Sequence, residues 1–429
     1  MQILYLAVSV IGAYATFIAY HPIRREPLSV VSFFVGWLVG ELAVQNMVCQ
    51  MLVSAVFVAF GALAGWAGWL GLAISTVSWA GLVGLYISGD RADEVMLKAL
   101  LVDCGALLNA NDQLASLIKP KWGRWWRTAL AIPRPDKGIE QIKNVDYFGD
   151  GDKRHRLDIL RSKSVGKSVD KSVSKSTIAN GNAPILIHVH GGAWLTGKKN
   201  EQARPMLYEL VANGWICVTI NYRLSPTATW PDQIVDIKKA ISWVREHADE
   251  YGGDSSFIAL SGGSAGGHLS ALAALTSCDS NLQPGFEGSD TSVMACVPFY
   301  GVMDLSSDNS GSKRYKDGLM KLLERWVMKL SSIEHPEVFE MASPTHRVHS
   351  EAPPFFVIHG KNDTLVPCQM AREFVKALKG VSKQPVVYAE LPRAQHAFDI
   401  LYSPRCRAVS AGAITFLNAV YLSLIKGDL

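Results

Sequence analysis

The sequence predicts an α/β fold with a mostly parallel central sheet and helices on both faces, preceded by an N-terminal transmembrane helical region. From residue 184 onward, short β-branched runs alternate with stretches of amphipathic helical spacing, which is typical of a parallel sheet. Before them, Tyr147–Leu160 contains a Gly-Asp-Gly turn and predicts an antiparallel hairpin that leads into the sheet. The expected parallel strands are Ile185–His190, Ile216–Ile220, Phe257–Leu260, Ala295–Phe299, Phe355–His359 and Val386–Glu390.

Residues 1–89 form the predicted membrane region, because only four of the first 88 residues are charged. Met1–Tyr20 is long enough to cross a hydrocarbon core of about 30 Å. A cleaved signal peptide is the rival interpretation, but the basic pair Arg24-Arg25 follows the apolar stretch instead of preceding it. Ala43–Ile87 is long enough for two further spans. Ser32–Leu42 contains Glu41, and we expect it to lie at the membrane interface.

Three spans are therefore expected, with four as the alternative. The arginines of the first loop and the basic residues after the last span favour the cytoplasmic side for both segments under the positive-inside rule. Three spans satisfy this condition, whereas four would place the C-terminal part of the chain outside. The sequence thus predicts a multi-pass membrane protein whose larger part faces the cytoplasm.

Three further segments complete the predicted organisation. Residues 90–140 form an amphipathic, interfacial helical connector with several Trp and basic residues, and residues 141–429 form the α/β domain. Residues 162–176 repeat Lys-Ser-Val-x and cannot build a core, so residues 162–180 are predicted to be a flexible insertion. Residues 307–340 interrupt the strands with helical spacing, which fits either a lid or an ordinary surface helix.

Composition excludes several classes of function. The net charge of +4 is too small to indicate nucleic-acid binding, and the basic residues lie next to the membrane region, where anionic lipid is the simpler partner. The seven cysteines are scattered without CxxC or CxxH spacing, so neither a disulfide framework nor a metal site is expected.

The strongest chemical signal is Gly262-Gly263-Ser264-Ala265-Gly266, which follows an apolar strand and precedes a helix. The G-x-S-x-G pattern is weak alone, but the strand before it and the helix after it are the context of a nucleophilic serine on a sharp turn. Small neighbours are needed because the chain folds back closely on itself there. The helix start would direct the Ala265 amide at a developing oxyanion.

A second glycine-rich motif, His190-Gly-Gly-Ala-Trp194, follows another strand. Its backbone amides could complete an oxyanion hole at Gly191, Gly192 or Ala193, of which we favour the latter two. His190 and Trp194 are interpreted as structural residues of this loop, as are Gly262 and Gly266 in the serine turn.

An acid and a base follow in the chain order expected for this architecture. Asp363 comes directly after one late strand, and His396 lies in the loop after the next. His396 would accept the Ser264 proton, and Asp363 would hold the imidazole. The nearby histidines, His268 and His359, are interpreted as packing or hydrogen-bonding residues. Two rival acids, Asp236 and Asp304, precede the expected strand and are interpreted as structural.

These motifs resemble the hormone-sensitive-lipase-like esterases of the α/β-hydrolase superfamily, and particularly a membrane-associated esterase/lipase group known from mycobacteria. The likeness rests on HGGAW, NYRLSP, GGSAGGHL, APPFFVIHGKNDTLVP and LPRAQHAFD from about residue 141 onward, and on FFVGWLVGELA in the membrane region. The resemblance implies an α/β-hydrolase fold, a Ser264–Asp363–His396 triad and no cofactor. Two features depart from the family: its HGGG signature is HGGA here, and the Lys-Ser-Val insertion matches no family pattern.

The main hypothesis is a membrane-anchored serine carboxylesterase or lipase that hydrolyses carboxylic esters through an acyl-serine intermediate. Its expected partners are a small-molecule or lipid ester and the membrane lipid, with no nucleic acid; the oligomeric state is left open. An arylformamidase or acetylxylan-type deacetylase on the same scaffold is the alternative. The non-enzymatic alternative is a membrane scaffold that has lost its catalytic activity.

Overall fold

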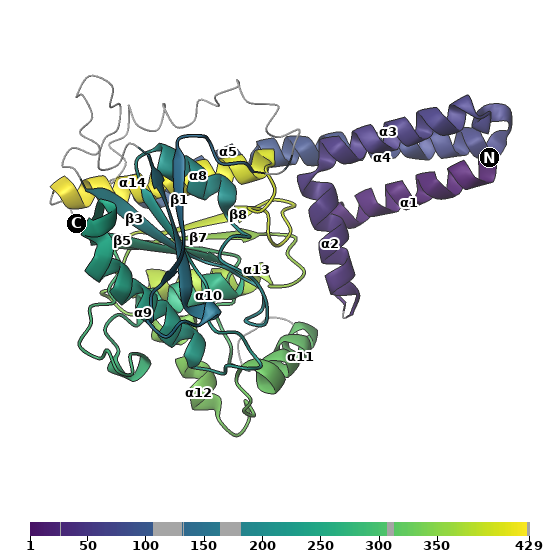
Figure 1. Cartoon of the computed structure of the whole chain (residues 1–429). Helices are drawn as coiled ribbons and strands as arrows, with labels where there is room; N and C mark the ends of the chain where they lie inside the picture. Colours follow the sequence, from purple (N-terminus) through teal and green to yellow (C-terminus); the bar gives the residue numbers. More distant parts are fainter. Residues whose placement is uncertain (26, 106–130, 132, 164–181, 307–312, 427–429) are drawn as a thin grey trace, which may run out of the picture.

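A central eight-stranded sheet organises the computed structural model (Figure 1), which describes residues 1–25, 27–105, 131, 133–163, 182–306 and 313–426. The strand order is β1-β2-β4-β3-β5-β6-β7-β8. The first two strands and the β2–β4 pair are antiparallel, and all the other pairs are parallel. The strands are β1 (Ile139–Asp146), β2 (Arg156–Ser162), β3 (Ala183–Val189), β4 (Ile216–Ile220), β5 (Gly253–Gly263), β6 (Ala295–Phe299), β7 (Phe355–Gly360) and β8 (Val386–Leu391).

Two hydrophobic cores cover the two faces of this sheet, because successive strand side chains point to opposite sides. In β3, Ile185 and Ile187 join one core, whereas Leu186 joins the other. The first core is completed by α9 (Asp232–His247), α10 (Ala265–Leu275) and α13 (Cys368–Lys379), and the second by α8 (Arg204–Ala212), α5 (Ala92–Cys104) and α14 (Pro404–Lys426). The mostly parallel sheet between helical layers agrees with the predicted α/β fold.

The N-terminal helices form an arm that projects away from the sheet (Figure 1). They are α1 (Gln2–Tyr20), α2 (Leu28–Glu41), α3 (Ala43–Ala59) and α4 (Trp66–Asp90). Small and hydroxyl side chains allow α1 and α4 to pack closely: Ser75 donates a hydrogen bond to Ser9, and Thr16 shares one with Ser78. Within the arm, the α2 helix meets α3 at an angle of 89° and turns toward the α/β domain.

Three helical stretches in the described part of the chain are long and apolar enough to cross a membrane, and the bent α2–α3 pair would make a fourth. Gln2–Tyr20 lies in the arm. Trp66–Cys104 begins in the arm as α4 and continues into α5. The third, Pro404–Ile425, is mostly buried within the protein. Burial against the second core explains its apolar character without a membrane.

Several predicted segments can be compared with the structure. The predicted antiparallel hairpin with its Gly-Asp-Gly turn is present, but its first strand, β1, ends at Asp146, before the predicted start at Tyr147. The helical part of the predicted connector, α5, packs into the second core; residues 106–130 lie outside the described residues, as do 164–181 of the insertion.

The predicted lid segment is described from residue 313 and contains α11 (Lys313–Leu322), one π-helical turn (Leu323–Val327) and α12 (Pro336–Met341). Leu323 and Val327 are buried in the first core, and the Val327 carbonyl accepts a hydrogen bond from the Trp230 amide. This part of the segment is therefore fixed to the domain.

Candidate active site

Ser264 occupies the sharp turn between β5 and α10. Its backbone angles are φ 56° and ψ −120°, a strained conformation for a residue with a side chain. The Ser264 amide donates to the Phe299 carbonyl at 3.0 Å, which ties the turn to the end of β6. The turn thus places the partly exposed serine at the carboxyl edge of the sheet, where open α/β sheets form their sites.

The glycines around Ser264 are required by close backbone contacts. A Cβ atom at Gly262 would lie 2.4 Å from the Gly266 carbonyl oxygen, and one at Gly266 would lie 2.1 Å from that of Val189. Neither neighbour is a flexible side chain that could move away. These distances support the structural role predicted for Gly262 and Gly266.

Asp363 and His396 are in direct contact, although 33 residues separate them in the sequence. The His396 Nδ1 atom lies 2.7 Å from Asp363 Oδ2, and both side chains are buried. The other carboxylate oxygen of Asp363 accepts hydrogen bonds from the Leu365 and Val366 amides, both at 2.8 Å. The carboxylate is therefore fixed from one side and orients the imidazole from the other.

The environment of Asp363 keeps it ionised. Burial raises the pKa of this carboxyl, but the electrostatic interactions and hydrogen bonds with His396 and His359 outweigh burial, so the pKa lies well below its usual range. His359 Nε2 lies 3.3 Å from Asp363 Oδ2 and 2.9 Å from the Val366 carbonyl oxygen. His359 thus has the hydrogen-bonding role expected for it.

Tyr300 links the serine turn to the histidine. Its ring centroid lies 4.3 Å from that of His396, and its hydroxyl would lie 2.7 Å from a Cβ atom placed on Gly263. The Tyr300 hydroxyl donates to the buried Asp399. Tyr300 therefore lies beside both Gly263 of the serine turn and His396. No hydrogen bond joins Ser264 to His396 among the described residues, and catalytic hydrogen bonds commonly shorten only when substrate is bound.

The loop after β3 is fixed by aromatic and hydrogen-bond contacts of His190. This side chain stacks on Tyr222 with ring centroids 4.4 Å apart, and the Tyr222 hydroxyl donates to the His190 carbonyl at 2.9 Å. Burial lowers the pKa of His190 to about 4, so the imidazole is neutral at pH 7. These contacts fit the structural role predicted for His190.

Trp194 is held in the same way at the end of this loop. Its indole N–H donates to His268 Nδ1 at 3.3 Å, and His268 Nε2 donates to the Ala342 carbonyl at 2.7 Å. Burial lowers the pKa of His268 to about 4. A neutral His268 has one donor and one acceptor nitrogen, and both are used.

The amides proposed for an oxyanion hole differ in availability. The Gly191 amide donates to Gln202 Oε1 at 2.7 Å, so it is already engaged. The amides of Gly192 and Ala193 have no hydrogen-bond partner within the described residues, and Ala265 begins α10, where amides lack partners within the helix. We therefore retain Gly192, Ala193 and Ala265 as candidate donors.

Ala193 is one departure from the HGGG signature, and its backbone conformation shows what the replacement changes. It replaces the third glycine of HGGG, yet its φ of 53° lies in the left-handed region that favours glycine. The alanine adopts the conformation at some energetic cost, and its methyl group adds apolar volume to the loop that faces the serine turn.

The rival acids lie in other contacts. Asp236 forms an ion pair with Arg223 at 2.6 Å, and Asp304 accepts hydrogen bonds from the amide and hydroxyl of Ser306. Both arrangements suit the structural roles expected for them. Among the described residues, no group of three or more His, Cys, Asp and Glu side chains is placed to hold a metal ion.

Sequence reasoning missed three contributors to this site. Gln202 lies in a loop with no motif of its own, and Asp399 ends the LPRAQHAFD motif without a role assigned to it. Only the folded chain shows that they contact Gly191 and Tyr300. Tyr300 itself follows β6 directly, and a polar side chain at a strand end was the signal that could have revealed it.

Comparison with known proteins supports an esterase. Residues 173–378 match the family model BD-FAE. The probable carboxylic ester hydrolase LipM of Mycobacterium tuberculosis is 41% identical over 448 residues, covering 100% of this chain and 95% of LipM. Esterase LipQ of the same organism is 40% identical over 379 residues, covering 83% of this chain and 85% of LipQ.

Solved structures show the same fold at lower identity. Esterase B from Lactobacillus rhamnosus is 19% identical, with a TM-score of 0.55 over 78% of this chain and 98% of that protein. This likeness shows that the two proteins share a fold. Together with the matches along the whole chain, the observations show that the protein is a carboxylic ester hydrolase and belongs to the hormone-sensitive-lipase-like family.

Proposed function

We propose that this ester hydrolase is a membrane-anchored serine carboxylesterase or lipase in which Ser264 forms an acyl intermediate. The observation that carries the proposal is the strained Ser264 turn at the sheet edge that also bears the Asp363–His396 pair. A serine in such a turn presents its hydroxyl to substrate, and an aspartate-held histidine is the group that activates it.

The chemistry follows from this arrangement. Because Asp363 holds the Nδ1 proton of His396, Nε2 is free to accept the Ser264 proton as Oγ attacks the ester carbonyl. The oxyanion that forms would accept hydrogen bonds from the Ala265 amide and from Gly192 or Ala193. Collapse breaks the bond to the alkoxide, which takes the proton from His396 and leaves as the alcohol. Water, deprotonated by His396, then hydrolyses the acyl-serine.

The membrane anchor is proposed as three spans: α1, α3 and α4. The end of α1 and the loop after it contact the α/β domain, because Arg24 donates to the Lys361 carbonyl at 3.0 Å and Arg393 lies over the Tyr20 ring at 4.9 Å. These contacts support a topology with the first loop and the enzyme on one side, as three spans require. The positive-inside rule favours the cytoplasmic side for both.

Single-cysteine labelling tests this topology. Cys278 is exposed on the enzyme, and Cys49 is exposed on α3. In sealed inside-out vesicles, a membrane-impermeant maleimide should label a variant that retains only Cys278 and should spare one that retains only Cys49. Labelling of Cys278 only in right-side-out vesicles would place the enzyme outside.

The proposed substrates are uncharged esters with short to medium acyl chains, in solution or from the lipid phase. A chain-length series of esters with the purified protein in detergent would define the acyl group. The arylformamidase and deacetylase alternative is tested by adding N-formyl and acetylated-sugar substrates; a higher kcat/KM for either would replace the ester assignment.

The acyl intermediate is tested with an activated ester and a fluorophosphonate probe. The unaltered protein should show a burst of product and label covalently, whereas Ser264→Ala should do neither. Ser256→Ala, an exposed serine earlier in β5, is the matched control and should behave as the unaltered protein does. Equal turnover by Ser264→Ala would exclude the mechanism.

A further inference from the structure

The inner face of α2 contacts the loop that carries His396. The Phe33 ring lies 6.0 Å from the His396 ring, centroid to centroid, at an interplanar angle of 82°. One turn later, the Trp37 indole N–H donates to the Ala397 carbonyl at 2.8 Å. The Phe33 and Trp37 rings stack on each other at 5.7 Å, so the two contacts act as one surface.

The same helix contacts the loop that carries Asp363. The Thr364 hydroxyl donates to the Ser29 carbonyl at 2.9 Å. Gln395 lies between the two loops under α2: its side-chain oxygen accepts from the Thr364 amide at 3.2 Å, and a Cβ atom at Gly36 would lie 3.3 Å from its Cγ. The helix therefore holds both catalytic loops against each other.

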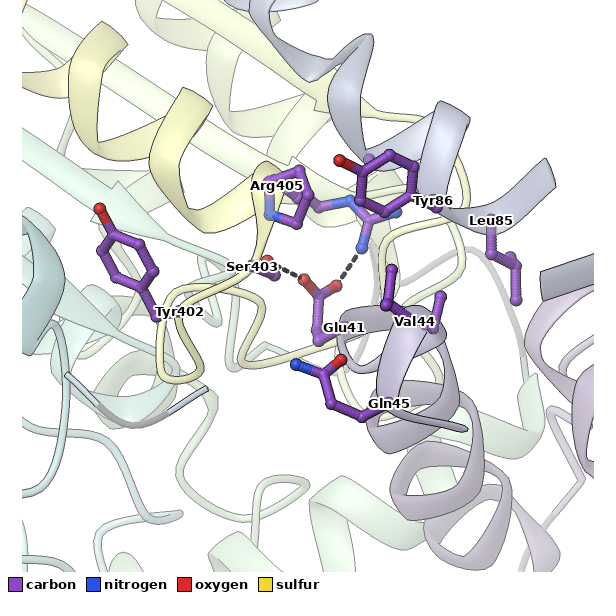
Figure 2. A pocket seen from close by; sticks show the side chains of 12 residues that line it. Glu41, Val44, Gln45, Leu85, Tyr86, Tyr402, Ser403 and Arg405 are labelled. Carbon is purple, nitrogen blue, oxygen red and sulfur yellow. Dashed lines mark hydrogen bonds and ion pairs between the residues drawn. The ribbon is translucent and has the colours of Figure 1, made fainter. Parts of the chain in front are cut away.

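A buried ion pair fixes the C-terminal end of α2 (Figure 2). Glu41 pairs with Arg405 and accepts a hydrogen bond from the Ser403 hydroxyl at 2.5 Å. Both charged side chains are only 1% exposed, and they line a cavity of about 240 Å³ between the arm and the start of α14. The position of α2 along the enzyme is thus set by a charged contact as well as by packing.

The outer face of α2 has the opposite character. Its side chains are apolar and exposed, and make a surface suited to lipid. These residues are Leu28, Val30, Val31, Phe34 and Leu38. The apolar surface and the contacts with the catalytic loops therefore lie on opposite faces of the same helix.

The His396 loop needs such support because its own backbone is strained. Arg393 and Ala397 have φ values of 55° and 61°, which a side chain disfavours. Strained residues persist where surrounding contacts determine their conformation. The Trp37 hydrogen bond ends on the carbonyl of Ala397, directly after His396.

We propose that Phe33 and Trp37 are positioning residues for His396, so that the membrane region completes the active site. The inference rests on the proposed role of His396 as the base that activates Ser264. Loss of either contact lets the imidazole leave the position in which it can reach the serine hydroxyl. Because both contacts act on the imidazole that transfers the proton, their loss reduces kcat and leaves KM for a small soluble ester nearly unchanged.

The test compares Trp37→Phe and Phe33→Leu in the full chain in detergent, with Trp66→Phe and Phe60→Leu as matched controls. Trp66 and Phe60 lie in the arm and are 75% and 70% exposed. The quantity measured is kcat per active site, with the sites counted by fluorophosphonate labelling at completion. A merely structural defect lowers the number of sites but not the kcat of each.

We expect kcat per site to fall by about 10- to 100-fold in both α2 variants, the size of effect that a misplacement of about 1 Å produces, and to stay within about twofold in the controls. Unchanged kcat per site in both α2 variants would overturn the inference. Ser264→Ala, measured alongside, separates the two proposals. Turnover equal to that of the unaltered protein would reject the serine mechanism itself, whereas an inactive Ser264→Ala with fully active α2 variants rejects only the positioning role.

Discussion

Replacing Asp363 by asparagine should leave the active site folded but chemically blocked. One carboxylate oxygen accepts two backbone hydrogen bonds at 2.8 Å, from Leu365 and Val366, and the other faces His396 Nδ1 at 2.7 Å. In the variant, the amide oxygen keeps the two backbone donors, so the amide N–H group faces the imidazole. His396 Nδ1 must then accept a hydrogen bond, and its proton moves to Nε2. An Nε2 that carries a proton cannot take another from Ser264.

The expected loss in kcat is about 10⁴-fold, as found when the aspartate of a Ser-His-Asp triad is changed to asparagine. At about 1.36 kcal/mol per factor of ten, the transition state is destabilised by about 5 kcal/mol. The assay is steady-state hydrolysis of an activated butyrate ester at pH 7.5, with thermal unfolding measured on the same samples. KM should change little, since Asp363 is buried behind His396.

Asp304→Asn is the matched control, because Asp304 is also buried and follows a strand of the same sheet. It should keep most of the activity, although its hydrogen bonds to Ser306 weaken. Activity of Asp363→Asn within tenfold of the unaltered protein would refute the argument, and a severe loss in Asp304→Asn alone would transfer the acid role to Asp304.

Three more predictions concern stability, each measured by thermal or denaturant unfolding in detergent. Gly266→Ala should destabilise the protein by about 3 kcal/mol through the clash with the Val189 carbonyl, whereas Gly288→Ala, with open space around it, should be neutral. Burial lowers the pKa of His268 to about 4, so the folded protein resists protonation of this side chain. The contribution of neutral His268 to the free energy of unfolding is complete above pH 6.5, where the unfolded imidazole is also neutral, and about 3 kcal/mol of it should be lost as pH falls toward 4. His268→Gln should flatten that slope. Glu41→Gln should cost about 3–5 kcal/mol because it leaves Arg405 buried without its counter-charge, and adding Arg405→Met should recover much of the loss; additive losses would contradict the pairing.

The predictions that agree with the structure depended on local signals. The six parallel strands predicted from β-branched runs all appear in the sheet, and the serine turn appears where the glycine pattern placed it. Asp363 and His396 could be paired because each directly follows a strand, and the ends of parallel strands meet at one edge. In such cases a few adjacent residues determine the geometry.

The features that sequence could not reveal depend on which surfaces meet. The periodicity of α5 shows one apolar face, but the same pattern suits a membrane interface and a protein core, and the structure buries it in the second core. The apolar N-terminal helices raise the same difficulty more strongly. In α2 almost every side chain is apolar, so nothing in the pattern separates Phe33, which faces His396, from Phe34, which is exposed. The engaged amide of Gly191 likewise depends on Gln202, eleven residues away.

The distribution of backbone strain connects these observations. Of the eleven non-glycine residues with positive φ in the described chain, six belong to the loops of the site: Ala193, Trp194, Ser264, Tyr300, Arg393 and Ala397. Each strained residue costs on the order of 1–3 kcal/mol and requires contacts that forbid the relaxed conformation.

For Ser264 those contacts come from the domain itself, through Phe299 and the glycines of its turn. For Ala397 a hydrogen bond comes from Trp37, in a helix outside the α/β domain. The proposed nucleophile is therefore held by the α/β domain alone, whereas the loop of the proposed base also contacts the N-terminal arm. A disturbance of the arm should consequently act on proton transfer before it acts on the nucleophile or on the fold.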